Sequence, residues 1–292
     1  MIQGFTAHIA TIDGARVAYS IGGPDGGALP PLLLLHGFPQ TRAMWGHIAP
    51  ELAKDRRVIC ADLRGYGASE KPQTMPEHSF RAMGADLLGL MSHLGHRRFD
   101  LVGHDRGART AHRMALDAPE RIRSLTVMDI VPTHLLLDDL NRHVAKGYYH
   151  WFFLAQPAPF PETMILHDPD AFYESCLLGW GAARLEDFDP AQLEAYRAAW
   201  RDPAVTGGMC NDYRAALAVD FDHDAADLAR PVTCPALVLY GAEGAMASAY
   251  DVPATWAARC TDMRAEAITG GHFFPDTNPA ATLAALKAFL PS

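Results

Sequence analysis

One nine-residue segment, Leu101 to Arg109, constrains the fold and the chemistry of this chain more than any other. Its sequence, LVGHDRGAR, passes from a buried-strand pattern through a Gly-x-Asp-x-Gly turn into a helical pattern. Strand-to-helix turns of this kind usually present a serine nucleophile, and here Asp105 takes that place. A serine that attacked a saturated carbon would form an ether that water cannot clear, whereas an aspartate forms an alkyl ester that activated water can hydrolyse. The turn therefore favours substrates with a leaving group on saturated carbon over simple esters.

Apolar runs recur along the chain and predict the strands of one sheet. We expect strands at 6–12, 16–20, 31–37, 57–63, 99–104, 124–129, 235–241 and 266–269. The first two flank Asp13-Gly14, which is a hairpin signal, and most later runs are joined by helical patterns such as 80–94. Alternating strands and helices with right-handed crossovers form a mostly parallel sheet flanked by helices. Its catalytic loops should follow the carboxyl ends of the strands.

A helical insertion is expected between about Pro132 and Arg230. This stretch contains no convincing strand pattern, and its aromatic residues and helical spacing predict helices at 135–155, 168–180, 190–200 and 208–220. We interpret 132–230 as a cap domain inserted into a core domain that comprises 1–131 and 231–292. Such a cap would lie over the carboxyl edge of the sheet and close the pocket from water.

Composition and charge exclude several other classes of protein. With 292 residues, 49% of them hydrophobic, the chain can bury a large core. A net charge of −9 without a basic block argues against nucleic acid or an anionic membrane as a partner. The five cysteines are far apart and include no C-x-x-C pair, which favours free thiols in a reducing compartment over a disulfide or metal site. We also expect no signal peptide and no membrane span, and therefore a cytoplasmic protein.

Two further segments offer partners for Asp105. Gly270-Gly271-His272 follows the last predicted strand, where His272 is placed to act as the base. The acid that orients His272 is either Asp129, which closes its strand directly, or Glu243 in a later loop, and the strand-end position favours Asp129. The loop His36-Gly37-Phe38 is either a tight turn or the source of one oxyanion-hole donor. In the second case the donors are the backbone N–H groups of Phe38 and Arg106.

These motifs resemble the haloacetate (fluoroacetate) dehalogenase family of the α/β-hydrolase fold, and the resemblance covers essentially the whole chain. It is carried by the residues at 36–41, 103–109, 128–130, 149–151, 211–214 and 271–273. The resemblance implies an α/β-hydrolase core with a helical cap, no cofactor or metal, and a possible homodimer. The implied roles are nucleophile for Asp105, base for His272, its partner for Asp129, substrate carboxylate binding for Arg106 and Arg109, and halide binding for His150, Trp151 and Tyr213.

The implied binding residues also make physical sense, although each has a simpler alternative. Arg106 and Arg109 are three apart on one helix, so both can reach one carboxylate, unless they form a solvated charged face. Imidazole, indole and phenol groups can donate hydrogen bonds to a departing halide, unless these aromatic residues only pack the cap onto the core. Trp180 is expected to be a core residue, with a gating role as the alternative.

The predicted reaction is the hydrolysis of a fluoro-, chloro- or bromoacetate to glycolate and halide through an aspartyl ester, with a small halogenated acid and water as the only reactants. An epoxide hydrolase is the nearest alternative, since it uses the same three catalytic groups together with tyrosine donors. The pair of arginines favours the haloacid, because a neutral epoxide gains nothing from two cations. A non-catalytic member of the fold that binds a small carboxylate is a third possibility, against which the presence of all three catalytic groups argues. Tyrosine candidates for the epoxide reaction are Tyr148, Tyr149, Tyr173, Tyr196 and Tyr213.

Overall fold

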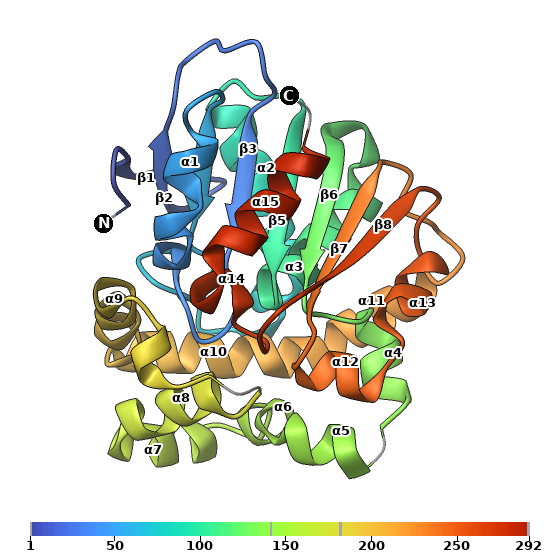
Figure 1. Cartoon of the computed structure of the whole chain (residues 1–292). Helices are drawn as coiled ribbons and strands as arrows, with labels where there is room; N and C mark the ends of the chain where they lie inside the picture. Colours follow the sequence, from blue (N-terminus) through green and yellow to red (C-terminus); the bar gives the residue numbers. More distant parts are fainter. Residues whose placement is uncertain (1, 141, 181–182, 291–292) are drawn as a thin grey trace.

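A central sheet with helices on both faces forms the core of the computed structural model, which describes residues 2–140, 142–180 and 183–290 (Figure 1). The strands are β1 (Thr6–Ile12), β2 (Ala15–Gly22), β3 (Leu32–Leu35), β4 (Val58–Ala61), β5 (Phe99–His104), β6 (Ile122–Met128), β7 (Ala236–Gly241) and β8 (Met263–Ile268). They lie in the order β1-β2-β4-β3-β5-β6-β7-β8. The pairs β1/β2 and β2/β4 are antiparallel, and the remaining pairs are parallel. Every predicted strand is present, within a few residues of its expected bounds.

The helices of the core cover the two faces of this sheet. Figure 1 shows α1 and α15 in front of the sheet and α2 and α3 behind it. The four leucines of β3 are fully buried, which explains why this strand reads as an unbroken apolar run. The core helices are α1 (Ala49–Leu52), α2 (Phe80–His93), α3 (Arg106–Asp117), α12 (Ala245–Ala249), α13 (Val252–Ala257), α14 (Phe274–Thr277) and α15 (Pro279–Phe289).

A helical insertion lies between β6 and β7, and in Figure 1 it forms the layer below the sheet. Its described residues form helices and turns and no strand. Its helices are α4 (Thr133–Asp138), α5 (Arg142–Gly147), α6 (Tyr149–Leu154), α7 (Phe160–His167), α8 (Pro169–Leu178), α9 (Pro190–Trp200), α10 (Pro203–Ala215) and α11 (Phe221–Ala226), with a π-helical turn, Ala216–Asp220, between α10 and α11.

Two of the expected helices differ from those observed. The helix predicted at 135–155 is three helices, α4, α5 and α6, and its span crosses residue 141, which lies outside the described residues. Gly147, a poor helix former, ends α5 one residue before the break at Tyr148. The helix predicted from 208 begins at Pro203, because Asp202 caps it by accepting a hydrogen bond from the N–H of Ala204. Glycine is a poor helix former, so the Gly207-Gly208 pair made the sequence pattern indicate a later start than the structure shows.

The parallel register brings the ends of neighbouring strands to one edge. Leu35 of β3 is opposite Gly103 of β5, and His104 is opposite Met128 of β6. The loops that follow these strands therefore meet beneath the sheet, where the insertion covers them. This is the edge that carries Asp105.

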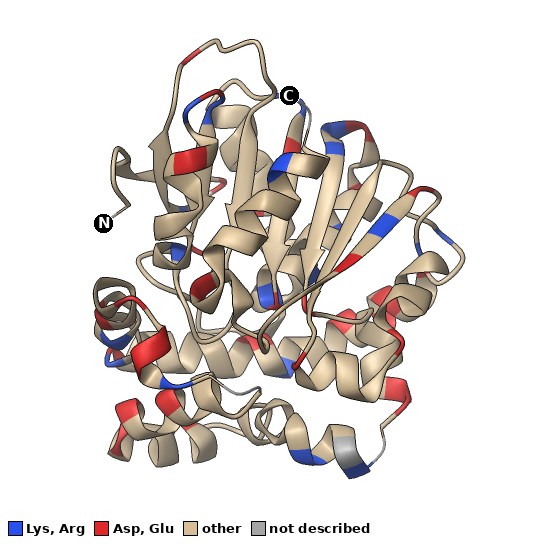
Figure 2. Cartoon of the chain, viewed as in Figure 1, with Lys and Arg blue, Asp and Glu red and all other residues tan. Residues whose placement is uncertain are grey.

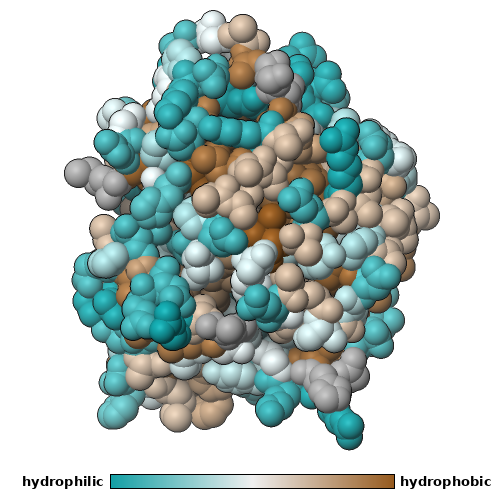
Figure 3. Space-filling model, viewed as in Figure 1, coloured by the Kyte–Doolittle hydropathy of each residue, from teal (hydrophilic) through white to brown (hydrophobic). Residues whose placement is uncertain are grey.

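Figure 2 shows positively and negatively charged residues interspersed along the ribbon. None of the helices in the described ranges combines the length and apolar composition that crossing a bilayer requires. Among the described residues of the insertion, the exposed large apolar side chains include Tyr149 of α6 and Phe160 and Met164 of α7. In Figure 3 tan atoms occupy the lower left, where α7 lies.

Candidate active site

Asp105 occupies a sharp turn between β5 and α3. Its backbone lies at φ 47° and ψ −114°, a region that L-residues rarely adopt. A Cβ atom at Gly107 would collide with the backbone carbonyl of His36, and one at Gly103 would collide with Gly107. The two glycines therefore allow α3 to pack against the strand ends and hold the Asp105 carboxylate, which is 5% exposed, at the edge of the sheet.

His272 and Asp129 complete a line of three buried groups with Asp105. Asp129 Oδ2 lies 2.6 Å from Nδ1 of His272, and Asp129 Oδ1 accepts a hydrogen bond of 2.8 Å from the N–H of Gly241. On the other side of the ring, His272 Nε2 is 3.8 Å from Asp105 Oδ2. Glu243 is exposed, so Asp129 is the one of the two candidate acids that contacts His272.

The charges at this centre set the protonation states. Burial favours a neutral Asp105, but the nearby His272 and Arg106 charges and the Phe38 N–H lower the pKa of Asp105 to about 2. Burial would likewise lower the pKa of His272, and the hydrogen bond and charge of Asp129 instead raise that pKa above 6.5. Asp105 is therefore ionised over a wide pH range, as a nucleophile must be.

The loop after β3 is both a tight turn and a source of a donor. The N–H of Phe38 donates to Asp105 Oδ1 over 2.9 Å. His36 fixes the loop, because its Nε2 accepts a hydrogen bond of 3.0 Å from the N–H of Leu63. Phe38 thus offers a backbone donor at the carboxyl group where an oxyanion would form during ester hydrolysis.

Arg106 and Arg109 are buried, so the interpretation as a solvated charged face is wrong. Arg106 Nε donates to Asp212 Oδ2 over 2.8 Å, and Arg106 Nη2 donates to Asp212 Oδ1 and, over 3.1 Å, to its backbone oxygen. Arg109 Nη1 donates to the backbone oxygen of Val131 and to Thr133 Oγ1, both at 3.1 Å. Within the described ranges, Arg106 Nη1 and Arg109 Nε are left buried with no hydrogen-bond partner.

Two of the three predicted halide ligands, Trp151 and Tyr213, lie against these arginines, and the third, His150, contacts Tyr213. The Tyr213 ring is 5.4 Å from that of His150 and 5.2 Å from that of Trp151, and the Arg106 guanidinium lies 4.3 Å from the Tyr213 ring. His150 Nδ1, Trp151 Nε1 and the Tyr213 hydroxyl are buried, and no described residue is their hydrogen-bond partner. Burial holds the pKa of His150 well below 6.5, so its imidazole is neutral. The aromatic residues pack the insertion onto the core and also present polar atoms that packing alone does not use.

Trp180 lies between His150 of the insertion and the predicted base, His272. Its ring centre lies 4.2 Å from that of His150 and 5.3 Å from that of His272, and its Nε1 donates to the backbone oxygen of Gly147 over 2.9 Å. It is 4% exposed, as expected for a core residue, and it also borders the candidate site. The geometry leaves the gating role a hypothesis.

Sequence analysis missed a buried network beside this site. The Tyr196 hydroxyl of α9 donates to Asp276 Oδ1 over 2.9 Å, and Gln40 Nε2 donates to Asp276 Oδ2. Burial, opposed by these hydrogen bonds, raises the pKa of Asp276 to about 7. The network ties the insertion to the Phe38 loop and to the helix that follows His272. No local pattern predicts it, because Gln40 and Asp276 are 236 residues apart.

The five tyrosines of the insertion differ in what they offer a substrate. The hydroxyl of Tyr173 donates to Thr206 over 3.1 Å, and that of Tyr196 is bound to Asp276. Tyr149 is 47% exposed, whereas Tyr148 and Tyr213 are buried. Of these five, the Tyr213 hydroxyl is the one found both buried and without a partner among the described residues.

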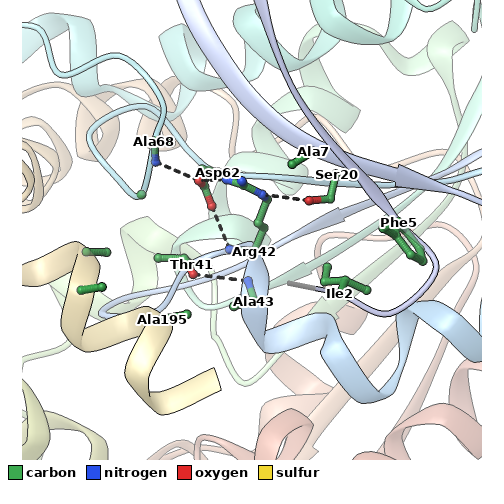
Figure 4. Close-up of a pocket in the computed structure, with 13 residues that line it drawn as sticks. Ile2, Phe5, Ala7, Ser20, Thr41, Arg42, Ala43, Asp62, Ala68 and Ala195 are labelled. Carbon is green, nitrogen blue, oxygen red and sulfur yellow. Dashed lines mark hydrogen bonds and ion pairs between the residues drawn. The ribbon is translucent and has the colours of Figure 1, made fainter. Parts of the chain in front are cut away.

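The described residues hold no group of three or more His, Cys, Asp or Glu side chains that could bind a metal ion, and the five cysteines are free. A separate cavity of about 330 Å³ lies between the N-terminal segment, the loop at 41–43 and α9 (Figure 4). Its charged groups are already paired, because Arg42 binds both Ser20 and Asp62. None of the residues at the Asp105 centre lines this cavity.

Comparison with known proteins relates the chain to hydrolases along most of its length. Residues 30–279 match the family model of the alpha/beta hydrolase fold. The chain is 50% identical over 293 aligned residues to a fluoroacetate dehalogenase from Burkholderia sp, covering 99% of this chain and 95% of that protein. It is 29% identical to a soluble epoxide hydrolase from Corynebacterium sp. (strain C12), covering 98% of each. The crystal structure of a candidate alpha/beta hydrolase from Nostoc sp PCC 7120 is 42% identical, with a TM-score of 0.96 over 99% of both chains.

Proposed function

The chain belongs to the alpha/beta hydrolase family, and from this premise we propose that it hydrolyses 2-haloacetates, fluoroacetate among them, to glycolate and halide. It is a hydrolase and a homologue of fluoroacetate dehalogenase, and the epoxide hydrolases are more distant relatives. The proposed substrate follows from that homology and from the chemistry of the groups around Asp105.

In the first half of the proposed reaction, a carboxylate oxygen of Asp105 attacks the methylene carbon of the haloacetate. The new carbon–oxygen bond forms as the carbon–halogen bond breaks, and the bonding electron pair leaves with the halide. Arg106 and Arg109 bind the substrate carboxylate, which Asp105 would otherwise repel, and so hold the carbon in line for attack. His150, Trp151 and Tyr213 donate hydrogen bonds to the halide as its negative charge develops.

In the second half, His272 Nε2 takes a proton from water, and the water oxygen attacks the carbonyl carbon of the Asp105 ester. The N–H groups of Phe38 and Arg106 stabilise the oxyanion that forms. Asp129 holds the Nδ1 proton of His272 and so leaves Nε2 free to accept. When the intermediate collapses, the departing glycolate oxygen takes the proton from His272. Asp105 is left as the carboxylic acid and loses the second water proton to solvent, which restores its carboxylate.

One observation carries the proposal: buried donor atoms without partners gather around an ionised carboxylate. They are Arg106 Nη1, Arg109 Nε, His150 Nδ1, Trp151 Nε1 and the Tyr213 hydroxyl, and within the described part of the chain none is satisfied. An unsatisfied buried polar group costs about 1–3 kcal/mol, so such a cluster is retained for a ligand that satisfies it. Two of the five atoms are on guanidinium groups, which fits an anionic substrate better than a neutral epoxide.

The His272→Asn variant tests this reaction, because it should form the Asp105 ester and fail to hydrolyse it. After incubation with chloroacetate or fluoroacetate, we expect mass spectrometry to find one carboxymethyl group on the peptide that contains Asp105. An adduct from styrene oxide and none from either haloacetate would replace the proposal with epoxide hydrolysis. As the companion control, Asp105→Ser should release no halide, and sustained turnover by that variant would contradict the covalent mechanism.

We further propose that residues 132–230 form a cap domain on a core of 1–131 and 231–292, and that the protein is a cytoplasmic homodimer. The free cysteines support a reducing compartment. The exposed apolar side chains of Tyr149, Phe160 and Met164 on the insertion support an interface between two copies. Sedimentation equilibrium of the wild type tests the dimer, and Phe160→Glu is expected to shift it to monomer.

A further inference from the structure

Asp212 is a fully buried carboxylate of the insertion that binds two groups of the core. It lies on α10, and its partner Arg106 is the first residue of α3, directly after the nucleophile. The Tyr66 hydroxyl, in the loop after β4, donates to Asp212 Oδ2 over 2.6 Å. Arg106 occupies both carboxylate oxygens through Nε and Nη2. Asp212 lies in the segment Asn211-Asp212-Tyr213, for which sequence analysis assigned a role to Tyr213 alone. The proposed reaction does not use Asp212 either.

These contacts fix the direction of the Arg106 guanidinium. A bidentate bond on the Nε and Nη2 side leaves Nη1 on the free side of a planar fork. Three rings hold that plane, since the Arg106 Cζ lies 4.6 Å from the Phe80 ring, 4.7 Å from the Trp151 ring and 4.3 Å from the Tyr213 ring. Arg106 Nη1 is buried and has no partner in the described ranges, so it is a single donor with a set orientation.

The two arginines therefore differ in what they contribute to an anionic substrate. The charge of Arg106 is balanced by Asp212, so this residue offers direction more than net charge. Arg109 donates to neutral oxygens, those of Val131 and Thr133, and it pairs with no carboxylate in the part of the chain that the structure describes. Arg109 is thus the source of uncompensated positive charge at the site.

We infer that Asp212, itself held by the Tyr66 hydroxyl, is a positioning residue that aims Arg106 Nη1 at the substrate carboxylate so that the halogenated carbon lies in line with Asp105. This inference rests on the proposed function. The two arginines then have different roles in binding. Arg109 attracts the haloacid by its charge, and the Asp212–Arg106 pair sets the orientation of the bound substrate. The orientation of Arg106 Nη1 also depends on the packing of the insertion against the core, since Asp212 belongs to the insertion and Arg106 to the core.

The Asp212→Asn variant separates direction from charge. It keeps the shape of the side chain, removes a negative charge beside the substrate and loosens the guanidinium. We therefore expect kcat for chloroacetate to fall by about 100-fold, the effect of a small misplacement of reacting atoms, while KM stays the same or decreases. Tyr66→Phe, which removes one of the groups that hold Asp212, should lower kcat by a smaller factor with KM unchanged. Arg109→Gln should show the opposite pattern, with KM raised.

Asp100→Asn is the matched control for a purely structural effect. Asp100 is also fully buried, and it also binds an arginine and a hydroxyl, through Arg56 Nη1 at 3.2 Å and the Ser124 hydroxyl at 2.7 Å, with Arg123 Nε as a second ion-pair partner at 3.9 Å. It lies near the start of β5, at the opposite end of the strand from Asp105. We expect Asp100→Asn to lower the melting temperature and to leave both kcat and KM near their wild-type values.

The outcomes distinguish this inference from the proposed function. If the wild type releases no halide from chloroacetate, the proposed function fails before any variant is compared. If the wild type is active and Asp212→Asn keeps its kcat, or loses activity through KM alone, only the role of Asp212 is overturned. If Asp212→Asn does not fold by circular dichroism, Tyr66→Phe decides: a wild-type kcat in that variant overturns the inference, and a lowered kcat with unchanged KM supports it.

Discussion

Replacing Tyr213 with phenylalanine removes one oxygen atom and is expected to stabilise the protein while slowing its reaction. The Tyr213 hydroxyl is buried and has no hydrogen-bond partner among the described residues, and the ring alone makes the contacts to Arg106 and Trp151. An unsatisfied buried hydroxyl costs about 1–3 kcal/mol, so Tyr213→Phe should raise the free energy of unfolding by about 1 kcal/mol. In the transition state the same hydroxyl would donate to the departing halide. A preorganised donor of this kind contributes about 3 kcal/mol, so kcat should fall by about 100-fold or more.

The assay pairs urea unfolding without substrate with halide release from fluoroacetate and bromoacetate. Fluoride is the poorer leaving group and the stronger acceptor, so we expect the larger loss of kcat with fluoroacetate. Tyr173→Phe is the matched control, because its hydroxyl lies in the same insertion and donates to Thr206. That variant should lose stability and keep its activity. A Tyr213→Phe protein that is less stable than the wild type, or that slows both substrates equally, would refute the reasoning.

Three further predictions concern the protonation states at and near this centre. Asp129→Asn should lower kcat by about 10⁴-fold, because an amide no longer holds the Nδ1 proton of His272, whereas Glu243→Gln should leave steady-state kinetics unchanged. Below the raised pKa of His272 its imidazolium cannot take a proton from water, while Asp105 stays ionised, so rapid-quench experiments at acidic pH should find one equivalent of halide released before turnover stops. Because burial raises the pKa of Asp276 from 3.8 to about 7, the folded protein keeps a proton that the unfolded chain loses in that window. The free energy of unfolding should therefore fall by a few kcal/mol as pH rises from about 4 to 7. Urea unfolding at several pH values should show that this decrease is absent from the Asp276→Asn variant.

The sequence predicts the parts of this molecule that local patterns determine. Strands such as β3 and β4 are apolar throughout because both faces of the sheet are covered, and each is followed by a polar residue. The turn at Asp105 is recognisable because glycines stand at fixed spacing on both sides of Asp105. Gly103 is required by a close contact with Gly107 inside the motif, and Gly107 by a close contact with the backbone of His36. These signals lie within one short segment, so they can be read without knowledge of the fold.

The contacts across the site depend on distant segments and could not be predicted in the same way. Asp212 and Arg106 are separated by 106 residues, and no spacing rule pairs an acid of one helix with a base of another at that distance. The strand-end position favoured Asp129 over Glu243 as the acid that orients His272, and the structure places the Asp129 carboxylate against the imidazole while Glu243 is exposed. Gly147 marks one helix end in the insertion, but the division of 135–155 into three helices was not predicted, because helix propensity is a weak signal for where a helix ends.

The positive φ angles of Asp105 and Asp129 set a limit on how this protein can be improved. Both carboxylates stand on backbone that glycine would adopt without strain, at a cost on the order of 1 kcal/mol for each non-glycine residue. A library selected for heat resistance alone would therefore enrich glycine or asparagine at these two positions and discard the groups proposed for the chemistry. Directed evolution of a more durable catalyst needs a screen for turnover in every round, with stabilising substitutions sought in the hydrophobic core, away from the site.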